Sequence, residues 1–262
     1  MTFTKQPIQN RYGKNILVHF EPARTPSDKL AIIQHGYSGS MDELHIKVMM
    51  NTYLANGYNV LMLDCTNSFN DADGSLEENT IQSHAEDLED AIKWASTQKW
   101  YSEPFALAGH SLGGLSIMAY ASKSSANIES LFPAAMVVNG KLLEKRTKEN
   151  RPDYYQELLD NGKAPMECSY KQNVSGYRPY SWYTTMYDWD AIEYAPNINA
   201  PTLFVVGDED HGTPPKDQQK VYDALHAPKK METIQGTYHC YEGKEDQMGQ
   251  LLDEWLKEIA NA

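Results

Sequence analysis

Apolar positions gather in short runs that are separated by longer, more polar stretches. Runs of four or five largely apolar residues are typical of strands buried on both faces of a parallel sheet. The chain has six such runs, at residues 30–33, 59–63, 105–108, 134–138, 202–206 and 231–234. Before the first run, residues 12–15 form a turn signal, and Ile16, Val18 and Phe20 then alternate with polar neighbours. This opening segment predicts a hairpin.

Between these runs the apolar residues recur at steps of three and four, which predicts helices. One helix is expected at residues 41–56 and a second, rich in small residues, at 116–122. Two further segments carry a continuous apolar stripe, with Ile81, Ala85, Leu88, Ala91, Ile92 and Ala95 in one and Met248, Leu251, Leu252, Trp255, Leu256 and Ile259 in the other. Strands alternating with helices predict an α/β fold whose mostly parallel sheet is covered on both faces.

One long segment interrupts this alternation. Residues 141–196 separate two predicted sheet strands but contain no obvious strand themselves. A connection of that length is usually functional. We therefore expect a core of residues 1–140 and 197–262, with residues 141–196 inserted as a lid.

Composition and charge narrow the classes of function. The formal net charge of -13 argues against nucleic acid and anionic membranes, because both partners require basic surfaces. No stretch approaches the roughly 18 apolar residues of a membrane span, and no secretory leader is expected at the first residues. The three cysteines, Cys65, Cys168 and Cys240, have no disulfide or metal-site spacing. We expect a cytoplasmic protein without metal or other cofactor.

A candidate nucleophile stands between a predicted strand and a predicted helix. Residues 109–113 read Gly-His-Ser-Leu-Gly, which matches the G-x-S-x-G motif with Ser111 at its centre. A serine on a sharp strand-to-helix turn stands clear of the sheet, and the glycines leave room for that turn. The following helix N-terminus directs N–H groups to the place where negative charge develops.

Such a serine needs a base and an acid, which follow it in this order in the chain: serine, acid, histidine. His239 follows the last predicted strand and is the expected base. The acid lies in the run of carboxylates at residues 208–210. Asp208 and Asp210 are both candidates; we favour Asp210, which lies further into the loop, and expect Asp208 to bind nearby loop amides.

The oxyanion of acyl transfer requires two backbone donors. Residues 35–39, His-Gly-Tyr-Ser-Gly, form the loop after the first buried strand, and their glycines let the backbone approach the serine. The N–H groups of Tyr37 and Leu112 are the expected pair, although an ordinary strand-to-helix loop would have the same composition.

Taken together, these motifs resemble the α/β-hydrolase superfamily, and within it the small bacterial carboxylesterases that include feruloyl and cinnamoyl esterases. The resemblance covers nearly the whole chain outside the lid and implies the same acid, Asp210, and the same oxyanion donors. One loop departs from the family pattern: residues 64–74 lack the arginine that usually follows the second sheet strand.

The predicted lid is rich in aromatic residues. Eight of the chain's 17 tyrosines and two of its tryptophans fall between residues 150 and 195. Either they pack the lid onto the sheet or they form a pocket wall for an apolar or aromatic group. The candidates for substrate contact are Tyr180, Trp182, Tyr183 and Trp189.

The expected activity is hydrolysis of a small-molecule carboxylic ester through an acyl-enzyme on Ser111, with a bias to apolar or aromatic esters. The same fold and residues also serve thioesterases, amidases, peptidases, lipases and cofactor-free haloperoxidases. A binding protein that retains the three residues for recognition is the alternative outside enzymes.

Overall fold

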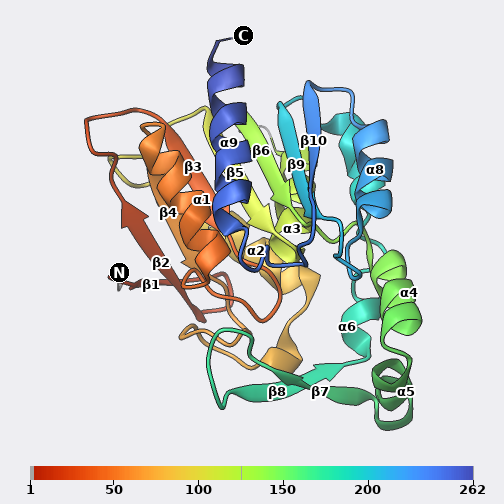
Figure 1. Ribbon diagram of the computed structural model, residues 1–262. Helices are drawn as coiled ribbons and strands as arrows, with labels where there is room; N and C mark the ends of the chain where they lie inside the picture. The colour runs from red at the N-terminus through yellow and green to blue at the C-terminus, as the bar shows by residue number, and fades with distance from the viewer. Residues whose placement is uncertain (1–2, 125, 262) are drawn as a thin grey trace.

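The computed structural model describes residues 3–124 and 126–261, which form an eight-stranded, mostly parallel sheet flanked by helices (Figure 1). Strand pairs β1–β2 and β2–β4 are antiparallel, and the remaining neighbours in the sheet are parallel. In spatial order the strands are β1 (Gln6–Gln9), β2 (Asn15–Glu21), β4 (Asn59–Asp64), β3 (Leu30–Gln34), β5 (Phe105–His110), β6 (Ile128–Ala134), β9 (Thr202–Gly207) and β10 (Lys229–Ile234). The predicted α/β-hydrolase fold is confirmed, and so is the opening hairpin.

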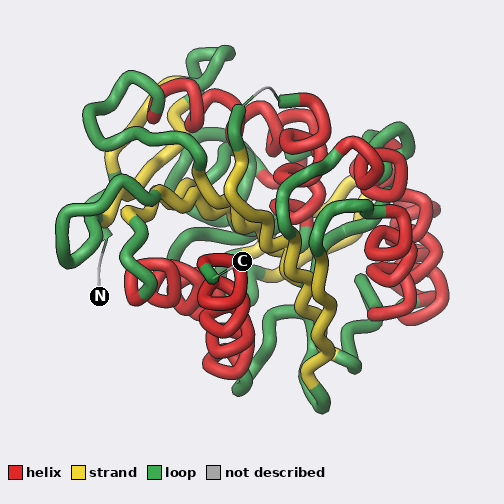
Figure 2. Tube along the Cα trace, turned by 90° about the horizontal axis from the view of Figure 1, so that it is seen from above, coloured by secondary structure: helices red, strands yellow, loops and turns green. Residues whose placement is uncertain are grey.

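Helices cover both faces of this sheet, as the view from above shows (Figure 2). Helices α1 (Leu44–Ala55) and α9 (Glu245–Ala260) bury their apolar side chains on one face. The other face is covered by α2 (Ile81–Ala95), α3 (Leu112–Lys123) and α8 (Pro215–Ala224). Because side chains alternate along a strand, β3 contributes to both apolar clusters and is buried throughout.

Local sequence explains where α2 begins. Thr80 Oγ1 accepts a hydrogen bond from the Ser83 N–H, and Ser83 Oγ accepts one from the Thr80 N–H. This reciprocal cap satisfies two N–H groups that the first turn leaves without helical partners. The apolar stripe that follows then faces the sheet, as the periodicity predicted.

The prediction of a strand at residues 134–138 was wrong, because β6 spans Ile128–Ala134. The apolar run continues past the end of the strand, where Ala135 adopts a positive φ of 42°. Its N–H donates to the Val205 carbonyl and the Val137 N–H donates to the Ser111 carbonyl. These residues are apolar because they are buried beneath the carboxyl edge of the sheet, not because they belong to it.

Between β6 and β9 the chain forms a separate set of short elements. These are α4 (Gly140–Asn150), α5 (Pro152–Asn161), β7 (Lys163–Glu167), β8 (Ser175–Pro179), α6 (Ser181–Thr184), α7 (Ala191–Tyr194) and the 3-10 turn η2 (Ala195–Asn197). The expectation that this segment holds no strand was therefore wrong. Strands β7 and β8 pair only with each other, below the main sheet in Figure 1, and their half-exposed sequences have no apolar alternation.

We call residues 141–196 the inserted segment. Its buried side chains, such as Leu158 and Met186, belong to the same apolar cluster as those of α2 and α3. A buried ion pair also ties it to the core: Arg146 on α4 donates from Nε and Nη2 to the two carboxylate oxygens of Asp217 on α8, at 2.8 and 2.9 Å. None of the helices in the described part of the chain is both long and apolar enough to cross a bilayer.

Breaking this ion pair should destabilise the protein. In Arg146→Ala the Asp217 side chain, only 3% exposed, keeps just the Lys220 ammonium at 3.2 Å. We expect the free energy of unfolding to fall by about 3 kcal/mol, because the remaining carboxylate is buried without its bidentate partner. Urea unfolding followed by circular dichroism measures the loss. Lys145→Ala is the control, since its side chain is 60% exposed; equal unfolding midpoints for the two variants would contradict the prediction.

Candidate active site

Ser111 occupies a strained turn between β5 and α3. Its φ of 54° and ψ of -112° lie in a region that residues other than glycine rarely adopt. Two backbone hydrogen bonds hold the turn: the Ser111 N–H donates to the Ala134 carbonyl at 2.9 Å, and the Ser111 carbonyl accepts from the Val137 N–H at 3.0 Å. The nucleophile candidate is therefore fixed by the strand β6 and the loop after it.

The two glycines of the motif allow this turn because nothing larger fits. A Cβ atom on Gly109 would lie 2.4 Å from the Gly113 carbonyl oxygen, and one on Gly113 would lie 2.5 Å from the His35 carbonyl oxygen. Strand and helix therefore approach each other more closely than any other residue type permits. The spacing of the motif thus follows from backbone packing.

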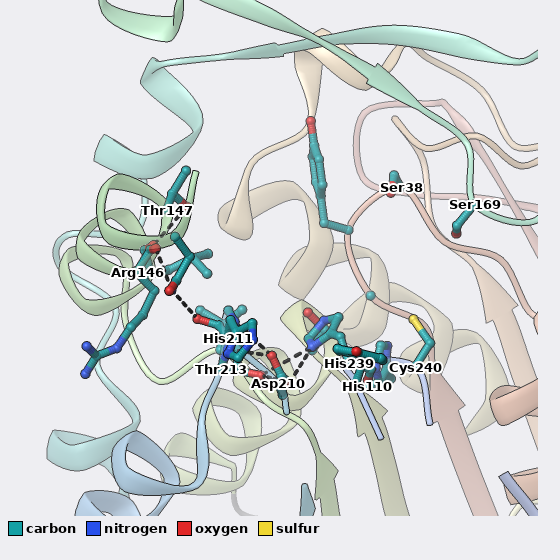
Figure 3. A pocket seen from close by; sticks show the side chains of 18 of the residues that line it. Ser38, His110, Arg146, Thr147, Ser169, Asp210, His211, Thr213, His239 and Cys240 are labelled. Carbon is teal, nitrogen blue, oxygen red and sulfur yellow. Dashed lines mark hydrogen bonds and ion pairs between the residues drawn. The ribbon is translucent and has the colours of Figure 1, made fainter. Parts of the chain in front are cut away.

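Asp210 and His239 lie side by side, as Figure 3 shows. Asp210 follows β9, is 2% exposed, and accepts from His239 Nδ1 through Oδ2 at 2.7 Å. Its other carboxylate oxygen accepts from the N–H groups of Gly212 and Thr213, both at 2.9 Å. Asp208 instead accepts from the Gly236 N–H at 2.6 Å and joins the loop after β9 to the turn after β10. The loop role expected for Asp208 matches this contact.

The charges of this pair stabilise each other. Burial raises the pKa of Asp210, but the charge and hydrogen bond of His239 and the donors of Thr213 outweigh it and lower that pKa to about 2. Burial likewise lowers the pKa of His239, while the Asp210 carboxylate outweighs burial and raises it above the ordinary value of 6.5. Asp210 is thus a fixed anion that strengthens His239 as a base.

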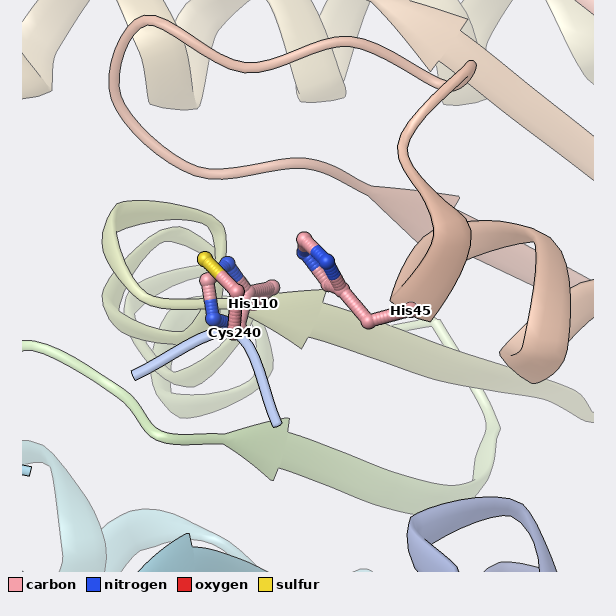
Figure 4. Close-up of side chains that lie close together, drawn as sticks. All are labelled: His45, His110 and Cys240. Atoms are coloured by element: carbon pink, nitrogen blue, oxygen red, sulfur yellow. The ribbon is translucent and has the colours of Figure 1, made fainter. Parts of the chain in front are cut away.

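Three uncharged side chains lie close together next to His239: His45 on α1, His110 at the end of β5 and Cys240, the residue after His239 (Figure 4). His110 donates from Nε2 to the His239 carbonyl oxygen at 2.9 Å. Burial lowers the pKa of His45 to about 3 and that of His110 well below its ordinary value, and it raises the pKa of the Cys240 thiol. His110 therefore holds the backbone of His239, and none of the three side chains adds charge beside it.

The same three side chains have nitrogen and sulfur atoms within 4.8 Å of one another, close enough to be considered as metal ligands. No spacing in the sequence indicates this, because the residues come from α1, β5 and the turn after β10. No metal was expected from the sequence, and neither His45 nor His110 was among the candidate site residues.

Ser111 and His239 open onto one cavity of about 480 Å³ between the sheet edge and the inserted segment. No hydrogen bond joins the Ser111 hydroxyl to His239 within residues 3–124 and 126–261; this contact is often long in ligand-free sites. Tyr37 also lines the cavity, and among the described residues its N–H has no backbone partner. Leu112 is the first residue of α3, where an N–H has no intrahelical acceptor.

Of the four aromatic candidates in the inserted segment, the structure brings only Trp182 to the cavity wall. Its ring packs 4.3 Å from the Tyr37 ring, centroid to centroid. Tyr180 donates to the Glu144 carboxylate, Tyr183 contacts the Thr147 hydroxyl, and Trp189 lies over a separate hollow beside Lys123. Much of the aromatic content therefore packs the segment, and one tryptophan faces the cavity.

Three cavity residues were missed from the sequence. Thr213 donates its N–H to Asp210, and its position three residues after the acid is the only available signal. Glu43, buried before α1, has its pKa raised to about 7 by burial. Arg178, on β8, also lines the cavity. Neither Glu43 nor Arg178 belongs to a recognisable pattern.

The fold has many solved relatives at low sequence identity. The structure titled "Ferulic Acid bound to Est1E from Butyrivibrio proteoclasticus" has a TM-score of 0.80 at 20% identity and covers 98% of this chain and 100% of its own. The Pyrococcus furiosus esterase Pf2001 has a TM-score of 0.73 at 16% identity, and the match covers 98% of this chain and 90% of the esterase chain. Mouse alpha/beta hydrolase domain-containing protein 10 has a TM-score of 0.69 at 16% identity, and the match covers 98% of this chain and 99% of the mouse protein's chain.

A search of curated proteins finds no match. The sequence pattern of one hydrolase family, described as serine aminopeptidase, S33, matches residues 25–246, which include every residue of the candidate site. The chain therefore belongs to this serine aminopeptidase family of α/β-hydrolases.

Proposed function

We propose that this hydrolase is a serine carboxylesterase with Ser111 as nucleophile, His239 as base and Asp210 as the orienting acid. One observation carries the proposal: a strained serine at a helix N-terminus shares a cavity with a histidine that is bonded at 2.7 Å to a buried carboxylate. Nucleophilic hydrolysis requires this combination of groups.

In the proposed reaction, His239 Nε2 accepts the proton of Ser111 as the hydroxyl oxygen bonds to the ester carbonyl carbon. The N–H groups of Tyr37 and Leu112 hold the resulting oxyanion. His239 then gives the proton to the leaving alcohol as the carbon–oxygen bond breaks, which leaves an acyl group on Ser111. Water repeats these steps and releases the acid.

The charges of the cavity support an ester over the peptide substrate that the family description suggests. An aminopeptidase must bind a free ammonium group near the scissile bond. Arg178 lines this cavity with no carboxylate partner among the described residues, so its guanidinium group repels such a cation on that wall, whereas Arg146 is already paired with Asp217 and Glu149. Thioesters and amides without a free amine remain the nearest alternatives on the same residues.

We also propose that the inserted segment, residues 141–196, acts as a lid over Ser111 and that Trp182 favours apolar or aromatic esters. Est1E, the relative of known structure, binds ferulic acid. The three free cysteines accord with the cytoplasmic location that we propose.

Replacing the nucleophile tests the central proposal. Ser111→Ala should lower the turnover of p-nitrophenyl esters by about 10⁴-fold or more, because the acyl-enzyme forms on the hydroxyl that this substitution removes. Labelling of the wild type by a fluorophosphonate, with the labelled peptide identified by mass spectrometry, locates the nucleophile. Near-wild-type turnover in Ser111→Ala, at an unchanged unfolding temperature, would exclude the proposal.

The raised pKa of His239 predicts the acid limb of the pH profile. Only neutral His239 accepts a proton, so kcat/KM should fall as the pH drops through a value above 6.5. Asp210→Asn should move this inflection to lower pH and reduce kcat strongly, because the charge that raises the pKa is lost.

Two control variants isolate this effect. Asp208→Asn should leave the inflection in place, since its contact is to the Gly236 N–H. Glu43→Gln removes a second group that could titrate near this pH, because burial raises the pKa of the Glu43 carboxyl in the cavity to about 7. If the inflection disappears in Glu43→Gln and persists in Asp210→Asn, the assignment of His239 as base is wrong.

The lid proposal predicts a modest aromatic preference. Ring stacking on Trp182 adds about 0.5–1.5 kcal/mol, so kcat/KM should favour methyl ferulate over a methyl alkanoate of similar size by up to about tenfold. Trp182→Ala should remove this preference, so that the two esters have similar kcat/KM values. Trp189→Ala is the matched control because Trp189 lies outside the cavity. If the ratio of the two kcat/KM values is the same in the wild type and both variants, Trp182 contributes only to packing and not to substrate preference.

A further inference from the structure

Arg178 brings a positive charge to the wall of the catalytic cavity. It lies on β8, the second strand of the inserted hairpin. Its guanidinium carbon stands 4.7 Å from the Tyr37 ring centroid and 4.5 Å from that of Trp182. Both rings thus lie within cation–π distance of the guanidinium, and neither offers it a charged acceptor.

Those N–H groups have few acceptors. A guanidinium carries five N–H donors. Within the described residues Arg178 donates only to the Tyr183 hydroxyl at 3.3 Å and to the Met166 sulfur at 3.5 Å, and its Nε is buried with no partner. The hydroxyl of Tyr37, which packs against Arg178, is buried and unpartnered as well.

The other arginines of the cavity differ from Arg178. Arg146 is held by the carboxylates of Asp217 and Glu149. Arg151 is exposed and lies over the Tyr154 ring. Arg178 has no carboxylate partner within residues 3–124 and 126–261, although the chain has 36 acidic residues against 23 basic ones.

Arg178 is half-buried, and leaving a guanidinium with a buried, unpartnered Nε and no counter-ion is costly. A structural guanidinium would find a carboxylate in so acidic a chain. The cation is instead kept on the cavity wall, where a bound molecule can supply the missing acceptors. The natural counter-ion for a planar fork is a carboxylate, which it can bind through two parallel hydrogen bonds.

We propose that Arg178 binds a carboxylate of the substrate, so that the natural substrates are esters with a second, remote carboxylate group. This inference rests on the proposed ester hydrolysis and adds the chemical class of the substrate. A monoanion suits the site better than a phosphate dianion, because Glu43, Glu209 and Asp210 also line the cavity. The Tyr37 hydroxyl would provide a further donor to the same carboxylate.

The test compares charged and neutral esters of the same shape. For an anion in the acid part, mono-p-nitrophenyl glutarate is paired with p-nitrophenyl 5-oxohexanoate, in which a methyl ketone replaces the carboxylate. For an anion in the alcohol part, 3-carboxyphenyl butyrate is paired with 3-acetylphenyl butyrate. In one of the two pairs, the wild type should hydrolyse the charged ester with a kcat/KM about ten- to a hundredfold higher.

Substitutions attribute this preference to Arg178. Arg178→Met should lower the kcat/KM of the charged ester about ten- to a hundredfold more than that of its neutral partner, so that the preference disappears. Arg178→Lys should retain only part of the preference, because an ammonium lacks the fork. Lys163→Met is the matched control: Lys163 lies on the same hairpin over the Tyr177 ring, but outside the cavity. It should retain the full preference.

The outcomes separate this inference from the proposed function. Two results would show that Arg178 only fastens the hairpin to Tyr37 and Trp182. In the first, the wild type hydrolyses the neutral and the charged ester equally well in both pairs; in the second, Arg178→Met lowers the kcat/KM of all the esters by the same factor. If no ester is hydrolysed, the proposed function fails, and calorimetric titration still tests the site. Wild type should then bind 4-phenylbutyrate more tightly than neutral 5-phenyl-2-pentanone, and Arg178→Met should not; equal binding would overturn the inference.

Discussion

The geometry of the site depends on one backbone constraint, the positive φ of Ser111. A residue with a side chain held in this region costs about 1–3 kcal/mol and persists only where its surroundings enforce it. Here the enforcement comes from hydrogen bonds to Ala134 and Val137 and from the close approach of Gly109 to Gly113. The apolar residues after β6 are needed for the same reason, since they bury the backbone that holds the serine.

The site also depends on how charges are distributed around His239. Asp210 is satisfied by several donors and remains an anion down to a pKa of about 2, whereas the neighbouring His45 and His110 are kept neutral by burial. Among the described residues, the charges that act on His239 are therefore negative: the bonded Asp210 anion contributes most, and Glu242 and Glu43 add to it. Its raised pKa follows from this one-sided environment.

Most of the core could be predicted from sequence because burial on both faces leaves continuous apolar runs. Where the run outlasted the strand, as at residues 134–138, the same signal gave the wrong boundary. The juxtaposition of Asp210 and His239 followed from chain order, since consecutive strands of a parallel sheet deliver their loops to one edge. The hairpin β7–β8 could not be predicted, because its strands are half-exposed and include Pro165 and Gly176.

The missing arginine in the loop of residues 64–74 shows another limit of local patterns. Asp64, fully buried at the end of β4, pairs with Lys5 at 2.7 Å and accepts from the Ser40 hydroxyl. The cation comes from near the N-terminus, far from the loop in sequence. The local sequence of the loop therefore gives no sign of the ion pair that holds Asp64.

Which aromatic residues line the cavity depends on how the inserted segment packs, and here its charges are more informative than its rings. Glu144 accepts from the hydroxyls of Tyr155, Tyr180 and Tyr187, so this carboxylate is satisfied within the segment. Arg178 lies in equally aromatic surroundings, yet its Nε has no partner and it faces the cavity. Packing alone explains a satisfied charge. An unsatisfied charge on the wall of the cavity that Ser111 also lines is better explained by the molecule that the cavity binds.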